Sequence, residues 1–193
     1  MTCSLSPSYR PGLSVGELLT ELGYLEGDRV TAEGQRLRRL YTELDLLAAE
    51  CLRAGVWADL DGPGLASVLS ALIHQSRREE QGVTPRVPGG PIESALREMV
   101  RTWAALEERE RDHRLPVSGE PDAGLAWAMH RWARGQSLEA VLRDSDLAAG
   151  DFVRRCKQLV DVLGQVAEAS SGPVQRAAHD AIDRVRRGVV ATN

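Results

Sequence analysis

The sequence has almost no lysine. Among its 24 basic residues only Lys157 is a lysine, and the others are arginines. This usage indicates a GC-rich coding bias more than a functional choice, because arginine codons are GC-rich. The formal net charge is −4 and the pI is about 5.6, which argues against a protein coated in positive charge for nucleic acid. A local basic stripe is still compatible with this balance.

Cysteine is also scarce. The three cysteines, Cys3, Cys51 and Cys156, are odd in number and widely spaced, and two of them lie on apolar helix faces. This pattern is typical of a reduced, cytoplasmic protein. No apolar run is long enough to span a membrane, and the first residues lack the basic-then-apolar layout of a signal peptide. We therefore expect no membrane partner.

Motifs for catalysis and metal binding are missing. The sequence contains no Walker-type GxxxxGK[ST], no CxxC pair and no HExxH, so it indicates neither a nucleotide phosphate site nor a zinc site. The histidines share no ligand spacing; they are His74, His113, His130 and His179. His130 lies between Trp127 and Trp132 on an expected helix, which is more typical of packed residues than of a catalytic base or a base-stacking platform. We expect no catalysis by this chain alone and no cofactor in it.

The sequence is instead rich in helical periodicity. It has 193 residues, 42% of them hydrophobic, which is enough for a packed core. Apolar residues recur at the spacing of a buried helix face in successive segments. These segments are residues 13–22, 31–55 with Thr31 as the cap and Gly55 as the stop, 61–78, 91–114, 122–133, 138–143, 150–168 and 171–187. The pattern predicts an all-α protein, most simply an antiparallel helical bundle with short connections.

A short N-terminal β-hairpin is expected beside the helices. Two apolar pieces flank the turn Glu26-Gly27-Asp28, which is a hairpin pattern. Helix, hairpin and helix in this order resemble the end of a winged-helix unit, although a plain hairpin that caps a bundle would leave the same pattern. The predicted division is residues 1–31 as a lead-in with a partial winged-helix end, and residues 32–193 as the bundle.

The stretch Gly150–Glu168 is the most informative helix. Its apolar residues fall on one face, as in a helix that packs on a core. The opposite face mixes hydrogen-bond donors with acceptors, and its residues are Arg154, Gln158, Asp161 and Gln165, with Arg155 and Lys157 beside them. This face fits a solvated surface helix or a helix that lines a nucleic-acid path. Periodicity alone does not choose between the two.

Several stretches in the same order resemble one known family. They are LGYLEGDRVTAEG at residues 22–34, LLAAECLRAGVW at 46–57, SALIHQSRR at 70–78, PDAGLAWAMHRWARG at 121–135, GDFVRRCKQLVDVLGQ at 150–165 and the ending RRGVVA at 186–191. The chain from about Leu18 onward resembles the DSHCT domain, the C-terminal helical bundle of superkiller-type DExH-box RNA helicases, and most of all its bacterial members. Arg155 departs from the tryptophan usual there, and Gln75 from an acid.

The resemblance implies a role in guiding RNA. In such helicases two ATPase domains precede a winged helix, and the bundle closes a ring around single-stranded RNA, whose bases touch one long "ratchet" helix. By position that helix corresponds to residues 150–168. The resemblance then implies that Arg154 and Lys157 meet phosphates and that Gln158 and Asp161 meet bases or sugars, with a weaker contact at Gln75, Arg77 and Arg78. ATP and Mg²⁺ would bind the helicase core, which is absent from this sequence and would be a partner in the same or a separate chain.

Two other functions are compatible with the sequence. Ser137–Leu163 can be interpreted as a helix-turn-helix with Gly150–Leu163 as the DNA-recognition helix, although the linker is longer than the usual tight turn and the chain is acidic. The chain could also be a purely structural module that docks on a helicase core or a nuclease. RNA guidance explains more of the sequence than either alternative.

Overall fold

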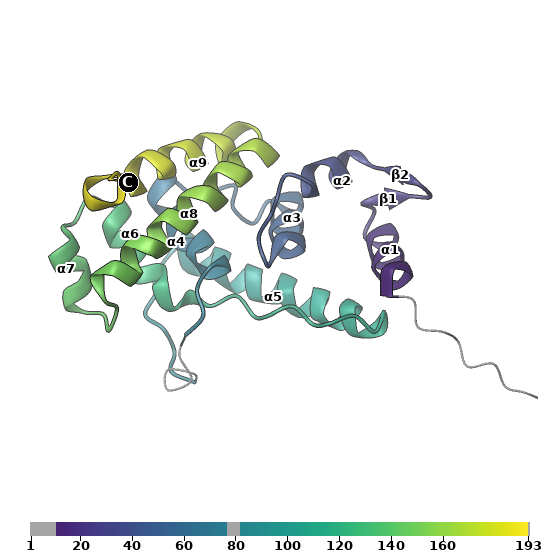
Figure 1. Ribbon diagram of the computed structural model, residues 1–193, viewed down its shortest axis with the longest axis horizontal. Coiled ribbons are helices and arrows are strands. Elements are labelled where there is room, and N and C mark those ends of the chain that lie inside the picture. Colours follow the sequence, from purple (N-terminus) through teal and green to yellow (C-terminus); the bar gives the residue numbers. More distant parts are fainter. Residues whose placement is uncertain (1–10, 77–81, 193) are drawn as a thin grey trace, which may run out of the picture.

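The computed structural model describes residues 11–76 and 82–192, with side chains from Val15 onward. Nearly all of its regular structure is helical, and the one sheet among the described residues is a two-stranded hairpin (Figure 1). In chain order the elements are α1 (Pro11–Glu21), β1 (Leu25–Glu26), β2 (Arg29–Val30), α2 (Ala32–Leu37), α3 (Asp45–Ala54), α4 (Gly62–Leu69), η1 (Ser70–Leu72), α5 (Pro91–Asp112), η3 (Ala123–Leu125), α6 (Ala126–Ala133), α7 (Leu138–Arg143), α8 (Ala149–Ala169), α9 (Gly172–Val185) and η4 (Gly188–Val190). The predicted all-α fold with one short hairpin is confirmed.

A buried helix, α4, lies at the centre of the bundle. Every residue of α4 is buried, and Asp61 caps its start by accepting a hydrogen bond from the Gly64 amide at 2.8 Å. It packs against α6 and α9, and α8 packs against α9 and also meets α4. The long helix α5 packs against α3 and α4. The core is therefore shared by helices from most of the described chain, with α8 and α9 side by side on one surface (Figure 1).

The hairpin forms where the sequence predicts it. Leu25 pairs with Val30 and Glu26 with Arg29 in an antiparallel register. Thr31 caps α2 by accepting from the Gly34 amide at 3.1 Å. Only glycine fits at position 34, because a Cβ there would collide with the carbonyl oxygen of Tyr24. The hairpin and α1 lie at the end of the molecule opposite α7 (Figure 1).

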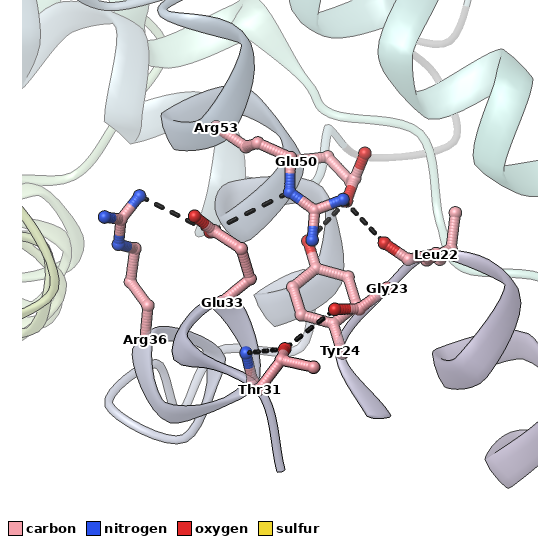
Figure 2. Close-up of polar contacts among 9 residues, drawn as sticks. Leu22, Gly23, Tyr24, Thr31, Glu33, Arg36, Glu50 and Arg53 are labelled. Carbon is pink, nitrogen blue, oxygen red and sulfur yellow. Dashed lines mark hydrogen bonds and ion pairs between the residues drawn. The ribbon is translucent and has the colours of Figure 1, made fainter. Parts of the chain in front are cut away.

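The hairpin is fastened to α3 by a polar cluster. The Tyr24 hydroxyl donates to Glu50, and Arg53 donates to the Leu22 carbonyl at 2.6 Å (Figure 2). Arg53 also pairs with Glu50 at 3.3 Å and with Glu33 at 3.8 Å. We call Tyr24, Glu33, Glu50 and Arg53 the hairpin cluster. It joins the two proposed parts of the chain, and whether the first part is the end of a winged helix stays a prediction.

One predicted helix is wrong. The apolar stripe from Leu37 to Leu52 was expected to form a single helix, but α2 ends at Leu37 and α3 begins at Asp45. The connection between them finds partners on α8, where the Tyr41 amide donates to Gln165 Oε1 at 2.6 Å and Arg39 donates to the Glu168 carbonyl at 2.6 Å. Long-range contacts replace the helical hydrogen bonds here, so the local pattern is misleading. The predicted stop at Gly55 is confirmed by its left-handed φ of 71°.

A second correction concerns the end of α9. A helix over residues 171–187, as predicted, would place Arg186 and Arg187 in its last turn, where the helix dipole favours cations, but α9 ends at Val185. The Arg187 guanidinium lies 3.6 Å from the centre of the Trp132 ring and donates to the carbonyls of Trp132 and Gln136. Trp132 in turn donates to the Val185 carbonyl at 2.9 Å. Arg187 therefore fastens the C-terminal end to α6.

Candidate nucleic-acid interface

The helix α8 has two distinct faces, as predicted. Its inner face is buried and consists of Phe152, Cys156, Leu159, Val160, Val162, Leu163, Val166, Ala167 and Ala169. On the other side Arg154, Lys157, Gln158 and Asp161 are all exposed. Asp151, at the start of the helix expected over residues 150–168, is of a type that often caps a helix, but α8 starts at Ala149 after Ala148, and Asp151 in its first turn pairs with Arg154 at 3.0 Å instead.

Two clefts lie along the polar face of α8. The first has a volume of about 400 Å³ and is lined by His74, Gln75, Pro85, Arg86, Gly124, Trp127, Ala128, Asp144, Ser145, Asp146, Leu147, Asp151, Arg154 and Arg155. The second has a volume of about 580 Å³ and is lined by Tyr41, Thr42, Glu43, Leu44, Leu72, Ile73, His74, Gln75, Gly119, Glu120, Arg155, Gln158, Asp161, Val162 and Gln165. Their walls come from segments far apart in the sequence.

The two clefts meet at Arg155. His74, Gln75 and Arg155 line both of them. The Arg155 guanidinium donates to the Ile73 carbonyl at 2.7 Å and to Gln158 Oε1 at 3.1 Å, so it bridges α8 to the chain that follows η1. We call the two clefts and this junction the α8 groove. It extends along α8 from Asp151 to Gln165.

The structure brings most of the predicted contact residues to this groove. Arg154 lines the first cleft, Gln158 and Asp161 line the second, and Gln75 lines both. Lys157 lines neither cleft and donates to the Thr192 carbonyl at 3.1 Å. Arg77 and Arg78 lie outside the described residues.

Hydrogen bonds to Asp122 fix the irregular segment that carries Gln75. The Asp122 carboxylate accepts from the amides of Ser76 at 2.6 Å and Gly124 at 2.8 Å, and the Asp122 amide donates to the Ala71 carbonyl at 3.0 Å. Burial alone would raise the pKa of Asp122, but these hydrogen bonds to the charged form outweigh it, and the pKa lies below its usual value. An ionised Asp122 thus positions one wall of the groove.

The charges in the groove do not favour phosphate groups. In the first cleft Arg86, Arg154 and Arg155 face Asp144, Asp146 and Asp151. In the second, the described lining carries the carboxylates of Glu43, Glu120 and Asp161 and only one arginine, Arg155. A polyanion would be repelled from this lining at close range. The mixture of amides, carboxylates and guanidinium groups suits neutral ligands that both donate and accept hydrogen bonds.

Two aromatic residues of the groove were not predicted as contacts. Trp127, expected to be a core residue, is half-buried in the first cleft with the Arg86 guanidinium 3.7 Å from its ring centre, and its buried Nε1 has no hydrogen-bond partner among the described residues. Tyr41 falls within the helix predicted over residues 31–55 and its apolar stripe, yet 79% of its surface is exposed at the second cleft. No local sequence signal marks either position, because both depend on how distant segments meet.

Comparison with known proteins identifies the family. The sequence matches the DSHCT (NUC185) domain over residues 27–192. The chain belongs to the DSHCT family. This DSHCT domain is 41% identical to the "Probable helicase HelY" of Mycobacterium leprae, in an alignment that covers 91% of the chain and 21% of that protein.

More distant relatives are named as RNA helicases. The DSHCT domain is 24% identical to the "ATP-dependent RNA helicase mtr4" of Schizosaccharomyces pombe, over 90% of the chain and 16% of the relative. It is 23% identical to the "DExH-box ATP-dependent RNA helicase DExH10" of Arabidopsis thaliana, over 91% of the chain and 18% of the relative. The chain thus spans about a fifth of the length of such relatives and corresponds to the C-terminal region of DExH-box helicases.

The described part of the DSHCT domain contains no group of three or more His, Cys, Asp or Glu residues placed to hold a metal ion. Within the same residues, no helix has both the length and the apolar character needed to cross a membrane. The helix-turn-helix alternative requires a projecting recognition helix, whereas the polar face of α8 forms one wall of two clefts.

Proposed function

We propose that this DSHCT domain guides single-stranded RNA, with α8 as the ratchet helix along which the strand moves. The observation that carries the proposal is the α8 groove: Arg154, Gln158 and Asp161, which follow one another about one turn apart along the helix, line clefts that meet at Arg155. A groove of this length presents contacts to successive nucleotides rather than to one small ligand. The names of the relatives support RNA as the ligand.

The strand would run with its bases toward the groove. The excess of carboxylates in the second cleft disfavours phosphates, whereas amides and carboxylates can hydrogen-bond exposed base edges without reading a strict sequence. Phosphates would stay at the outer edge. There Arg154, whose side chain is 63% exposed, and the exposed Lys157 would neutralise them.

The domain would supply no chemistry of its own. The sequence has no phosphate-binding GxxxxGK[ST] motif. ATP and Mg²⁺ would bind a DExH helicase core, which would be the protein partner of this domain in the same or a separate chain. The cytoplasm is the expected compartment.

RNA binding can be measured directly on this chain. We would record the fluorescence anisotropy of a short labelled single-stranded RNA at low and moderate salt with the wild type, Arg154→Ala, and Arg154→Ala/Lys157→Ala. We expect salt-sensitive binding that weakens roughly fivefold for the single variant and further for the double variant. Arg184→Ala is the matched control, because Arg184 is also an exposed helical arginine paired with an aspartate, at 2.7 Å, but lines neither cleft.

Two results would contradict the proposal. Tight, sequence-specific binding of duplex DNA with no preference for single-stranded RNA would favour the helix-turn-helix alternative. Absence of RNA binding at low salt, together with retention of a purified helicase core on the immobilised chain, would favour a protein-interaction module.

A further inference from the structure

Tyr41 is an exposed aromatic residue at the α8 groove. Its side chain lines the second cleft, and 79% of its surface is exposed. Of the large hydrophobic residues that the structure describes as exposed, Tyr41 is the only aromatic one and the most exposed. Exposure of this size leaves most of the ring open to a ligand.

The backbone that carries Tyr41 is well anchored. The Tyr41 amide donates to Gln165 Oε1 at 2.6 Å, and Arg39 donates to the Glu168 carbonyl at 2.6 Å, so both residues are attached to α8. Leu40 and Leu44 on either side are buried, at 3% and 8% exposure. The ring therefore projects from a segment that is fixed on the helix, which reduces the entropy lost when a ligand binds.

The surroundings of Tyr41 indicate a nucleobase more than an apolar protein surface. The second cleft offers the amides of Gln75, Gln158 and Gln165 and the carboxylates of Glu43, Glu120 and Asp161. Base edges carry amino donors and carbonyl acceptors that match such groups, whereas an apolar docking residue would leave these groups desolvated and unpaired. A phosphate group is disfavoured by the three carboxylates.

We propose that Tyr41 is a stacking platform for a nucleobase of single-stranded RNA, which lies on the Tyr41 ring with its polar edge toward the amides and carboxylates of the second cleft. The inference rests on the proposed function and adds to α8 a contact that comes from the connection between α2 and α3. Stacking on an aromatic ring accepts every base, which suits a site along which RNA moves.

Three variants test the stacking. We would compare Tyr41→Leu, Tyr41→Phe and, as a control off the groove, Val100→Ala, which removes part of a 38% exposed apolar side chain on α5. RNA affinity should fall roughly 5- to 100-fold for Tyr41→Leu and stay within about twofold for the other two, because only the first removes the aromatic ring. Thermal unfolding should be unchanged for Tyr41→Leu, since the ring is exposed.

Photo-crosslinking locates the base independently. RNA that carries 5-iodouridine should crosslink to Tyr41 on irradiation, and mass spectrometry after trypsin digestion should find the adduct on the peptide of residues 40–53. RNA binding that is equal in wild type and Tyr41→Leu, with crosslinks elsewhere, such as on Trp127, would overturn the stacking but leave the proposed function intact. Neither binding nor crosslinking by the wild type would overturn both.

Discussion

Tyr24 and Tyr41 have opposite environments in the same molecule. Tyr24 is 1% exposed, its hydroxyl donates to Glu50, and the Arg53 guanidinium lies 4.4 Å from its ring centre (Figure 2). Burial, and next the bond to Glu50, raise the pKa of Tyr24 above its usual range, so the hydroxyl stays a donor. Tyr41 is 79% exposed at a groove. The first tyrosine is structural, and the second is available to a ligand.

The surroundings of the two tyrosines differ in the same way. In the hairpin cluster the charged groups satisfy one another: Glu33 pairs with both Arg36 and Arg53, and Arg53 also reaches a backbone carbonyl (Figure 2). Around the α8 groove, polar side chains from several segments line open clefts. A dense set of charged residues therefore does not by itself mark a binding site. A candidate binding site needs, in addition, an open cleft that such residues line.

The largest effect is expected from Tyr24→Ala. Loss of a buried aromatic ring and of its bond to Glu50 should lower the free energy of unfolding by about 3–5 kcal/mol, measured by urea denaturation. Tyr41→Ala should change it by less than about 0.5 kcal/mol. Under conditions in which both variants are folded, Tyr41→Ala should lower the RNA affinity more than Tyr24→Ala does.

Tyr24→Phe is the control for the hydroxyl. It keeps the ring and should cost only about 0.5–1.5 kcal/mol. Equal destabilisation by Tyr24→Ala and Tyr41→Ala would mean that the contrast between a structural and an available tyrosine is wrong.

The sequence predicts the elements that local chemistry determines. Thr31 caps α2 as predicted, and Asp61 and Ser137 cap α4 and α7 at the starts of predicted helices, because a capping side chain reaches only the amides of the next turn. The turn Glu26-Gly27-Asp28 gives the hairpin, since Gly27 adopts a positive φ of 60°. The two faces of α8 follow from its periodicity.

The sequence does not predict what distant segments determine. The stripe through Leu37, Leu40 and Leu44 is continuous, so nothing local reveals the break that Gln165 and Glu168 support from α8. Similarly, the basic residues near the end of α9 suggest that the helix dipole stabilises them. The Arg187 guanidinium instead packs over the ring of Trp132. The second cleft combines residues of α8 with residues 41–44, 72–75 and 119–120, so the sequence can name single contact residues but cannot show that they meet in one cleft.

Removal of Arg53 should have a smaller effect than removal of Tyr24. Arg53→Ala deletes a hydrogen bond to the Leu22 carbonyl and two ion pairs, and because the side chain is 31% exposed we expect a loss of about 1–2 kcal/mol in urea denaturation. Arg184→Ala, which removes one exposed pair with Asp180, should lose no more than about 0.5 kcal/mol. Comparable losses would show that the hairpin cluster is no more cohesive than a surface pair.

Asp122 provides a pH test of the groove wall. Its pKa is lowered in the folded state, so its ionisation stabilises the fold above the usual value of 3.8, and this contribution is lost as the pH falls through the lower folded value. Asp122→Asn should lower the free energy of unfolding by about 0.5–1 kcal/mol at pH 7, because hydrogen bonds to a charged acceptor are stronger than those to a neutral one, and the difference from wild type should shrink toward pH 3. Urea denaturation at both pH values measures this. A difference that does not depend on pH would rule out a role for the carboxylate charge.

The smallest expected effects are changes in the salt dependence of RNA binding. They would show whether Arg154 and Lys157 both contact phosphates. Each cation that neutralises a phosphate of single-stranded RNA contributes about 0.7 to the slope of log affinity against log salt. Arg154→Ala and Lys157→Ala should therefore each reduce the slope by about 0.7 if the phosphates pass along the outer edge of α8, whereas Tyr41→Leu should lower affinity without changing it. A slope that Lys157→Ala leaves unchanged would place the strand on the Arg154 side alone. That outcome would agree with the position of Lys157 beside the Thr192 carbonyl, outside both clefts.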